Sequence, residues 1–190
     1  MLWDDFVNSV RHDWRGSGAS EDRLDKPEWL SRWVADHHLN IAGVPTKREL
    51  AALKRLRSLL LRIIKAVVAE EATSQADLDE LNHTLAKGPV MRRIVSVNGR
   101  YQVVVAAIRY DWPQVMSDIA ASFALALTEG EVARIRVCDN PDCKRVYYDE
   151  TRNRSKRFCD DRICGNLMKV RRFRARQKAE RLGDAGEGRS

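Results

Sequence analysis

Four cysteines, all that the 190-residue chain contains, lie close together in its C-terminal part. They follow the spacing C-x4-C-x15-C-x4-C and are Cys138, Cys143, Cys159 and Cys164. A short C-x4-C loop can turn two thiolates toward one point, and two such loops supply the four soft donors that tetrahedral Zn²⁺ requires. The spacing therefore predicts one structural zinc ion held by all four cysteines.

Two local disulfides, or free thiols, are the alternative use of these cysteines. The first residues, MLWDDFVNSV, lack the basic and apolar regions of a signal peptide. No stretch approaches the roughly 20 apolar residues that span a bilayer, so no membrane partner is expected and a cytoplasmic location is predicted. Because the cytoplasm is reducing, it favours metal binding over disulfides.

The positive charge of the chain is concentrated around and after these cysteines. Residues 144–181 carry 14 Lys/Arg against 5 Asp/Glu, and the remainder carries 20 against 22, within a formal net charge of +7. This distribution predicts a polyanionic partner for the cysteine module. The candidate nucleic-acid contacts are cations of the loop and of the segment that follows: Arg152, Arg154, Lys156, Arg157, Lys169, Arg171, Arg172, Arg174, Arg176 and Lys178.

The segment after Cys164 is expected to be a helix that the zinc ion fixes in place. On a helical wheel, Val170 and Phe173 share a narrow face that is predicted to dock on the zinc core. Asn166 and Gln177 lie beside them, and basic stripes flank this face on both sides. Such a helix suits a groove between phosphate strands, which makes DNA the favoured partner.

RNA, or nucleic acid bound without selectivity, is the alternative partner. Tyr147, Tyr148 and Phe158 lie beside arginines in the sequence and could stack unpaired bases. Positive charge alone does not separate DNA from RNA.

The elements that must position this module indicate an α+β fold. Residues 1–130 are expected to form a mainly helical sensing or regulatory domain with a β-hairpin. Residues 131–182 are expected to form a treble-clef-like or ribbon-like zinc module that ends in the basic helix, and residues 183–190 a disordered tail. Within the module, a strand over 132–137 leads to the first cysteine, and residues 146–148 are expected to form a small hairpin with 156–158.

The N-terminal domain shows five helical patterns and one hairpin. The helices are expected over residues 1–15, 27–39, 47–70, 75–85 and 111–127. Thr46 and Glu49 form a capping box at the start of the third helix, and the fifth has almost no polar face, which predicts that it is the buried centre. Asn98-Gly99 between two alternating runs, 91–97 and 101–106, predicts a type I′ hairpin.

The sequence resembles the CGNR zinc-finger proteins, whose N-terminal part is called the ABATE domain. The resemblance rests on C-D-N-P-D-C at 138–143, Y-Y-D at 147–149, T-R-N-R-S-K-R-F-C at 151–159, C-G-N at 164–166, K-V-R-R-F-R-A-R at 169–176, D-F-V-N-S at 5–9 and L-N at 81–82. It thus covers nearly the whole chain, most specifically at the C-terminal end. The resemblance implies a bacterial transcription regulator that binds DNA through its zinc module.

One position departs from the family pattern. The name-giving fourth residue, an arginine in the family, is Leu167 here. If that arginine contacts DNA or fixes the turn, this member differs in affinity or target, while its four metal ligands are intact.

No pattern of a catalytic site is present in the sequence, and the chain is predicted not to be an enzyme. The four histidines are scattered, and no phosphate loop, dinucleotide fingerprint or G-x-S-x-G occurs. A sensing role would need a pocket for a small-molecule effector, and its candidate lining is Asp5, Asn8, Arg11 and Asn82. Local backbone bonding by Asn82 is the alternative, and association into a homodimer is a further possibility for this domain.

Overall fold

The computed structural model describes residues 1–41 and 43–187, and the side chains of the last helix as far as Arg181. The helices are α1 (Leu2–Val7), α2 (Pro27–Asp36), α3 (Lys47–Val68), α4 (Gln75–Leu85), α5 (Trp112–Thr128) and α6 (Asn166–Glu187). Short helical turns are η1 (Arg23–Asp25), η2 (Val132–Arg134) and η3 (Asp161–Gly165). The strands form two-stranded antiparallel sheets: β1 (Val10–His12) with β2 (Ser20–Asp22), β3 (Val90–Val97) with β4 (Arg100–Ala107), and β5 (Ile135–Val137) with β6 (Val146–Tyr148). The predicted α+β class is confirmed.

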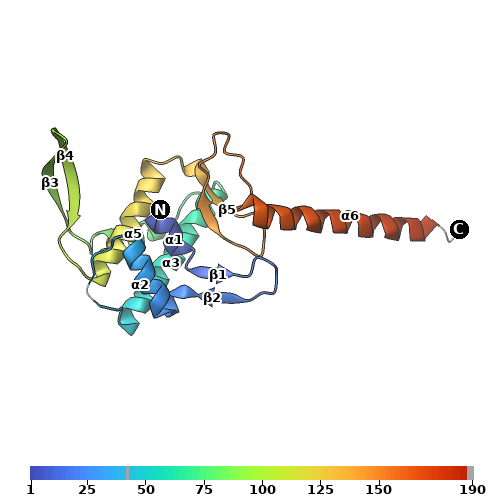
Figure 1. Ribbon diagram of the computed structural model, residues 1–190, viewed down its shortest axis with the longest axis horizontal. Coiled ribbons are helices and arrows are strands. Elements are labelled where there is room, and N and C mark those ends of the chain that lie inside the picture. Colours follow the sequence, from blue (N-terminus) through green and yellow to red (C-terminus); the bar gives the residue numbers. More distant parts are fainter. Residues whose placement is uncertain (42, 188–190) are drawn as a thin grey trace.

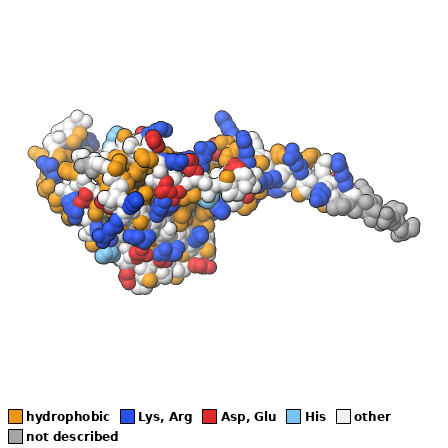
Figure 2. All heavy atoms as spheres, turned by 90° about the horizontal axis from the view of Figure 1, so that it is seen from below, with side chains coloured by type: hydrophobic (Ala, Val, Ile, Leu, Met, Phe, Trp, Pro, Cys, Tyr) orange, Lys and Arg blue, Asp and Glu red, His pale blue; other side chains and the backbone are white. Residues whose placement is uncertain are grey.

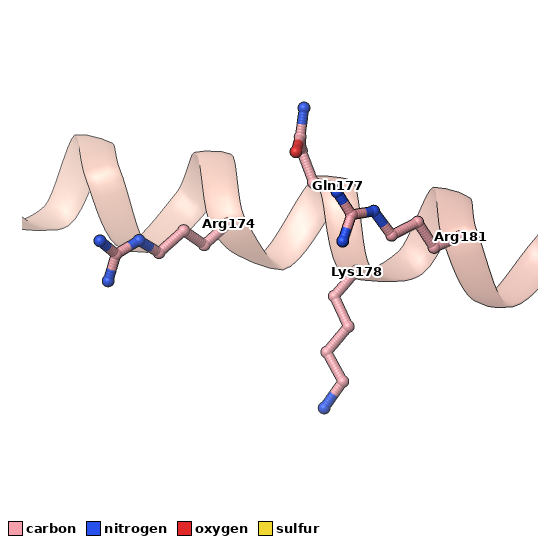
Figure 3. A pocket seen from close by; sticks show the side chains of 4 residues that line it. All are labelled: Arg174, Gln177, Lys178 and Arg181. Atoms are coloured by element: carbon pink, nitrogen blue, oxygen red, sulfur yellow. The ribbon is translucent and has the colours of Figure 1, made fainter.

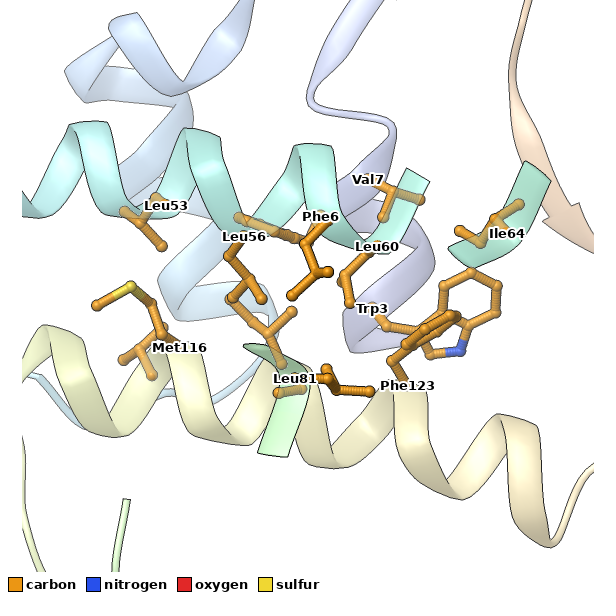
Figure 4. Close-up of a cluster of buried hydrophobic side chains, with 14 of the residues drawn as sticks. Trp3, Phe6, Val7, Leu53, Leu56, Leu60, Ile64, Leu81, Met116 and Phe123 are labelled. Carbon is orange, nitrogen blue, oxygen red and sulfur yellow. The ribbon is translucent and has the colours of Figure 1, made fainter. Parts of the chain in front are cut away.

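The main hydrophobic core lies between α1, α3, α4 and α5 (Figure 4). Trp3 and Phe6 of α1 and Phe123 of α5 are fully buried in it, and the rings of Trp3 and Phe123 lie 5.4 Å apart. Burial of each such side chain stabilises the folded state by about 1.5–3 kcal/mol. The prediction that the fifth helix is a buried centre is confirmed, because its buried residues run from Trp112 to Ala126.

The long helix α3 begins as the sequence predicts. The Thr46 hydroxyl accepts a hydrogen bond from the backbone N–H of Glu49 at 3.3 Å, and the Glu49 carboxylate accepts from the backbone N–H of Thr46 at 2.8 Å. This reciprocal capping box satisfies two N–H groups that an uncapped helix would leave free. The helix ends at Val68, two residues before the expected end.

The first fifteen residues do not form one helix, so that expectation was wrong. Helix α1 ends at Val7, and the chain continues as β1, in which Arg11 pairs with Glu21 of β2. The cause is tertiary: buried Ser9 accepts a hydrogen bond from Arg57 of α3 at 2.8 Å, and its carbonyl accepts from Arg23 N–H at 2.9 Å. These bonds outweigh the helical pattern of the apolar residues.

The β3–β4 hairpin confirms the Asn-Gly prediction. Val97 pairs with Arg100, and the two residues between them have φ of 52° (Asn98) and 75° (Gly99), as a type I′ turn requires. The hairpin stands away from the helices, at the end of the molecule opposite α6 (Figure 1).

The sheet of the cysteine module differs from the expected hairpin. Strand β6 pairs with β5, Ile135 opposite Tyr148, and not with residues 156–158. The reason is burial: Ile135 and Val146 belong to the main core, so this sheet packs against α3 and α1. The expected strand over 132–137 is divided into the η2 turn and β5. The core thus continues past residue 130.

The last helix is longer than expected. Helix α6 ends at Glu187, inside the segment 183–190 that was expected to be disordered, and residues 188–190 lie outside the described part. In Figure 1 it projects from the cysteine module as a single straight rod.

Candidate metal centre and nucleic-acid interface

Three different elements bring the four cysteines together. Cys138 and Cys143 lie in the loop that joins β5 to β6, Cys159 follows the long loop after β6, and Cys164 lies in η3, directly before α6. Their sulfur atoms all lie within 4.8 Å of one another, with 3.6 Å between Cys143 and Cys159 and 3.9 Å between Cys159 and Cys164. A tetrahedral zinc–thiolate site has sulfur atoms about 3.8 Å apart. The cluster therefore fits one structural zinc ion.

The electrostatics of the four thiols are consistent with a bound cation. Hydrogen bonds from Cys143 and Cys159 lower the pKa of Cys138 to about 2, and so stabilise one thiolate. The hydrogen bond to Cys138 raises the pKa of Cys143 to about 12, and the pKa of Cys159 is raised for the same reason. Four adjacent thiolates repel one another, so a divalent cation is needed to hold all four deprotonated.

Asn140 supports the metal site and was missed by the sequence reasoning. Its side chain is fully buried and donates to the carbonyl of Trp14 at 2.9 Å and to the sulfur of Cys164 at 3.5 Å. Its oxygen accepts from Asp142 N–H at 3.2 Å and closes the first cysteine loop. The position of this asparagine between two closely spaced cysteines could have indicated its role, because side-chain amides in such loops often form hydrogen bonds with backbone N–H and C=O groups.

Asp149 organises the loop that leads to Cys159. Its buried carboxylate accepts from the Thr151 hydroxyl at 2.6 Å, the Thr151 N–H at 2.9 Å and the Lys156 N–H at 3.0 Å. Desolvation opposes ionisation of this carboxyl, but the hydrogen bonds outweigh it, so the pKa of Asp149 is lowered. The loop is therefore held from inside by a carboxylate.

The ten predicted nucleic-acid contacts fall into two groups. Three of them form ion pairs within the molecule: Arg154 with Glu131, Arg157 with Asp139 at 2.6 Å, and Arg171 with Asp142 at 2.6 Å. No carboxylate of the described residues forms an ion pair with the other seven, which are Arg152, Lys156, Lys169, Arg172, Arg174, Arg176 and Lys178. Most of the uncompensated charge is therefore on α6.

The docking face of α6 is not the predicted one. Val170 and Phe173 are 45% and 53% exposed, whereas Met168 packs on the cysteine cluster together with Trp14. Arg171 lies on the same side of the helix as Met168 and also anchors α6 to the protein, because it donates a hydrogen bond to the carbonyl of Arg15 at 2.8 Å. The cause is the direction in which η3 starts the helix. Asp160 caps η3 by accepting from the N–H groups of its second and third residues.

The exposed part of α6 carries cations along its length. Figure 2 shows Lys and Arg side chains following one another along the projecting helix. A shallow hollow on its surface is lined by Arg174, Gln177, Lys178 and Arg181 (Figure 3). Leu167, at the position of the family arginine, is half-buried at the first turn.

The four residues of the expected ligand pocket have other surroundings. Asp5 binds His37 at 3.0 Å, and Asn8 binds the backbone of Val146. Arg11 is exposed in β1, and Asn82 is exposed on α4. Among the described residues, no hydrogen bond joins any two of these four side chains.

No helix in the described part of the chain is both long enough and apolar enough to cross a membrane.

Two family models match the chain. The ABATE model, described as "Putative stress-induced transcription regulator", matches residues 2–130, and the CGNR zinc-finger model matches residues 134–177. A comparison with curated proteins finds no match. The first model spans more than half of the chain, and the second contains all four cysteines. The chain therefore belongs to the ABATE family and carries a CGNR zinc finger at its C-terminal end.

Proposed function

We propose that the protein is a transcription regulator that binds duplex DNA through α6, held in place by the zinc module. The observation that carries this proposal is the projecting helix itself, because its cations other than Arg171 form no ion pair within the described molecule. Uncompensated cations on a rod about 10–12 Å across match the width and charge of the DNA major groove. Under this proposal the protein would function in the cytoplasm, where it would bind DNA.

Salt titration tests this proposal directly. If about six phosphates are neutralised, the logarithm of the binding constant falls with the logarithm of salt concentration with a slope near −5. Arg174→Gln is expected to reduce that slope by about one. Arg157→Gln is the matched control, because Arg157 already pairs with Asp139 and should change the slope less. Absence of salt-dependent binding to duplex DNA would overturn the proposal.

The structure favours duplex DNA over unpaired RNA at one specific point. Two of the three aromatic rings considered for base stacking are buried, Tyr147 at 7% and Phe158 at 8% exposure. The Tyr147 hydroxyl donates to the Lys156 carbonyl at 2.6 Å, and the Tyr148 hydroxyl accepts from Glu131 N–H. Stacking platforms need exposed rings. A competition assay with duplex, single-stranded DNA and RNA distinguishes the partners, and tighter binding of single-stranded RNA would reverse this preference.

For the N-terminal domain we infer association between two copies through the β3–β4 hairpin. One face of this hairpin carries Ile94 (75% exposed), Tyr101 (84%), Val103 (65%) and Val105 (63%). A hairpin alone is at best marginally stable in water, and its free edges can pair with an identical edge about a twofold axis. Ligand sensing is less well supported, because the hollow between α3 and α4 is lined by Lys54, Arg62 and Glu80, which already form ion pairs.

Light scattering coupled to size exclusion tests the association. The wild-type protein is expected to be a dimer, and Ile94→Lys is expected to be monomeric. Leu125→Lys on α5 is the control, since Leu125 is also exposed, at 51%, but lies outside the hairpin. A monomeric wild type would overturn this role.

The proposed role involves no catalysis by the metal. Four thiolates fill the tetrahedral coordination of zinc and leave no position for water or substrate. Under this proposal the ion has a structural role, and the helix that follows Cys164 provides the DNA-binding surface.

A further inference from the structure

Helix α6 presents an exposed face of a particular composition. Asn166, Val170, Phe173 and Gln177 follow one another at spacings of four, three and four residues, so they lie on one side of the helix. All four are exposed, including an aromatic ring and a branched aliphatic side chain. The opposite side, with Met168 and Arg171, contacts the cysteine module. The apolar face therefore points away from the protein.

Cations border this face on both sides. Helical spacing places Lys169 and Arg176 along one border, and Arg174, Lys178 and Arg181 along the other. Figure 3 shows Gln177 and Lys178 leaving the helix in different directions. When a helix lies in the major groove, its two borders face the phosphates of the two strands and the face between them meets the base edges.

The cations also determine which kind of partner can bind to the apolar face. A second copy packing on the same face would bring Lys169, Arg174 and Arg176 against the same three charges. A polyanion, in contrast, is attracted by both borders. Charge complementarity therefore selects nucleic acid over an apolar protein surface.

We propose that Val170 and Phe173 contact the 5-methyl groups of thymine in the major groove, so that α6 prefers A·T base pairs. The methyl group of thymine is the apolar group that bases offer in this groove. Gln177 is the amide assigned to adenine, whose N6 amino group donates to the glutamine oxygen and whose N7 accepts from the glutamine nitrogen. Asn166 is not assigned, because its amide donates to the Arg162 carbonyl at 3.0 Å.

This inference rests on the proposed binding of duplex DNA, and the experiment separates the two. Full-length zinc-loaded protein is titrated with duplexes of equal length, alternating d(A-T), d(A-U) and d(G-C). The d(A-U) duplex differs from d(A-T) only in lacking the 5-methyl groups. Burial of one methyl group corresponds to about a fourfold change in affinity. The wild type is expected to bind d(A-T) about fourfold more tightly than d(A-U) for each methyl contacted.

The variants assign the effect to residues. Phe173→Ala is expected to reduce the preference for d(A-T) over d(A-U) by about fourfold for each methyl that Phe173 contacts, while its salt dependence stays the same, and the double variant with Val170→Ala is expected to lose the preference. Arg174→Gln is expected to weaken all three complexes equally. Because Phe173 is exposed, its removal should leave zinc content and helicity unchanged, and both are measured.

Each outcome decides one question. Equal affinity of the wild type for d(A-T) and d(A-U), or a wild-type preference that survives in the double variant Val170→Ala/Phe173→Ala, overturns the methyl contact but leaves duplex binding intact. Failure to bind any of the three duplexes overturns both the contact and the proposed function.

Discussion

The side-chain amide of Asn8 holds both backbone groups of Val146. Its nitrogen donates to the Val146 carbonyl at 2.7 Å, and its oxygen accepts from the Val146 N–H at 2.9 Å. The amide thus acts as an extra strand residue beside β6 and connects the end of α1 to the sheet that carries the first two cysteines. Residues separated by 138 positions are joined by this one side chain.

Replacing Asn8 with alanine tests this connection. The substitution leaves the N–H and carbonyl of Val146 without partners, and each unsatisfied buried group costs about 1–3 kcal/mol. We expect the free energy of unfolding, measured by urea denaturation, to fall by about 2–3 kcal/mol. Asn82→Ala on α4 is the control because Asn82 is exposed, and an equal loss in both variants would contradict the assignment.

Asn140→Ala is expected to weaken zinc binding without removing a ligand. The substitution deletes the hydrogen bond to the Cys164 sulfur and the tie to the Trp14 carbonyl. Loss of a group that orients a metal ligand costs about 10–100-fold in metal affinity. Competition with a chromogenic chelator measures the change. Asn153→Ala, in the exposed loop, should keep wild-type affinity, and unchanged zinc affinity of Asn140→Ala would show that the amide only closes the loop.

Local signals in the sequence predicted much of the fold. The capping box of α3, the Asn98-Gly99 turn, the apolar α5 and the clustering of four cysteines each depend on residues near one another in the chain, and all are confirmed. Short-range patterns of this kind reflect backbone geometry and burial.

The sequence could not predict contacts between distant segments. The end of α1 at Val7 depends on Arg57 and Val146, and the pairing of β6 depends on the core that Ile135 completes. The exposed face of α6 depends on how η3 starts the helix, so the helical wheel was wrong in predicting that Val170 and Phe173 dock on the zinc core. Residues far apart in sequence decide each of these features.

Zinc removal is expected to affect more than the cysteine module. In that module Tyr147 and Phe158 are buried with the cysteines, and Trp14 and Met168 pack against them, which is too small a cluster to fold without the ion. We expect Cys159→Ser to lose zinc and duplex binding. Because Ile135 and Val146 belong to the main core, the thermal midpoint of the remaining helices should also fall. Circular dichroism and metal analysis measure both effects, and Ser155→Ala is the control. Retained duplex binding without zinc would show that α6 binds DNA without support from the metal site.

Acid is expected to destabilise the N-terminal domain through Asp22. Desolvation opposes its ionisation, but hydrogen bonds and charge from Arg57 outweigh this, so the pKa of Asp22 is lowered. The bonds are 2.7 and 2.6 Å long and Arg57 is buried. A lowered folded-state pKa stabilises the protein above the unfolded value of about 3.9, and this stability is lost as pH falls through the folded-state value.

Asp22→Asn should remove that dependence. The variant leaves the buried Arg57 guanidinium without its carboxylate at neutral pH, which we expect to cost about 3 kcal/mol. Its loss of stability between about pH 5 and pH 2 should then be smaller than that of the wild type. Urea denaturation at several pH values measures the slope. Glu21→Gln is the control, because the ion pair of Glu21 with Lys26 is exposed. Parallel slopes for Asp22→Asn and the wild type would contradict the role of the Asp22–Arg57 pair.

Helix α6 is expected to gain helicity when it binds DNA. Its packing within the described molecule is mainly on η3, so most of its length has no tertiary support. Like charges three or four residues apart, such as Arg172 with Arg176 and Arg174 with Lys178, destabilise a helix by about 0.2–0.5 kcal/mol per pair. Most of the stability of protein helices comes from tertiary packing, which this part of α6 does not have. Neutralisation by phosphates removes the repulsion, so far-UV ellipticity at 222 nm should become more negative on addition of a duplex.

The substitution Arg174→Glu tests whether repulsion between like-charged side chains limits the helicity of free α6. It replaces a like-charged pair with a Glu–Lys pair at the favourable i, i+4 spacing to Lys178, so the free protein should become more helical. The same change places a negative charge beside the phosphates and should weaken duplex binding. Helicity that rises in the variant without DNA, and rises in the wild type only with DNA or high salt, identifies charge repulsion as the cause. If the free wild type and the variant have the same ellipticity, and neither responds to salt, the helix is stable alone and binds DNA already formed.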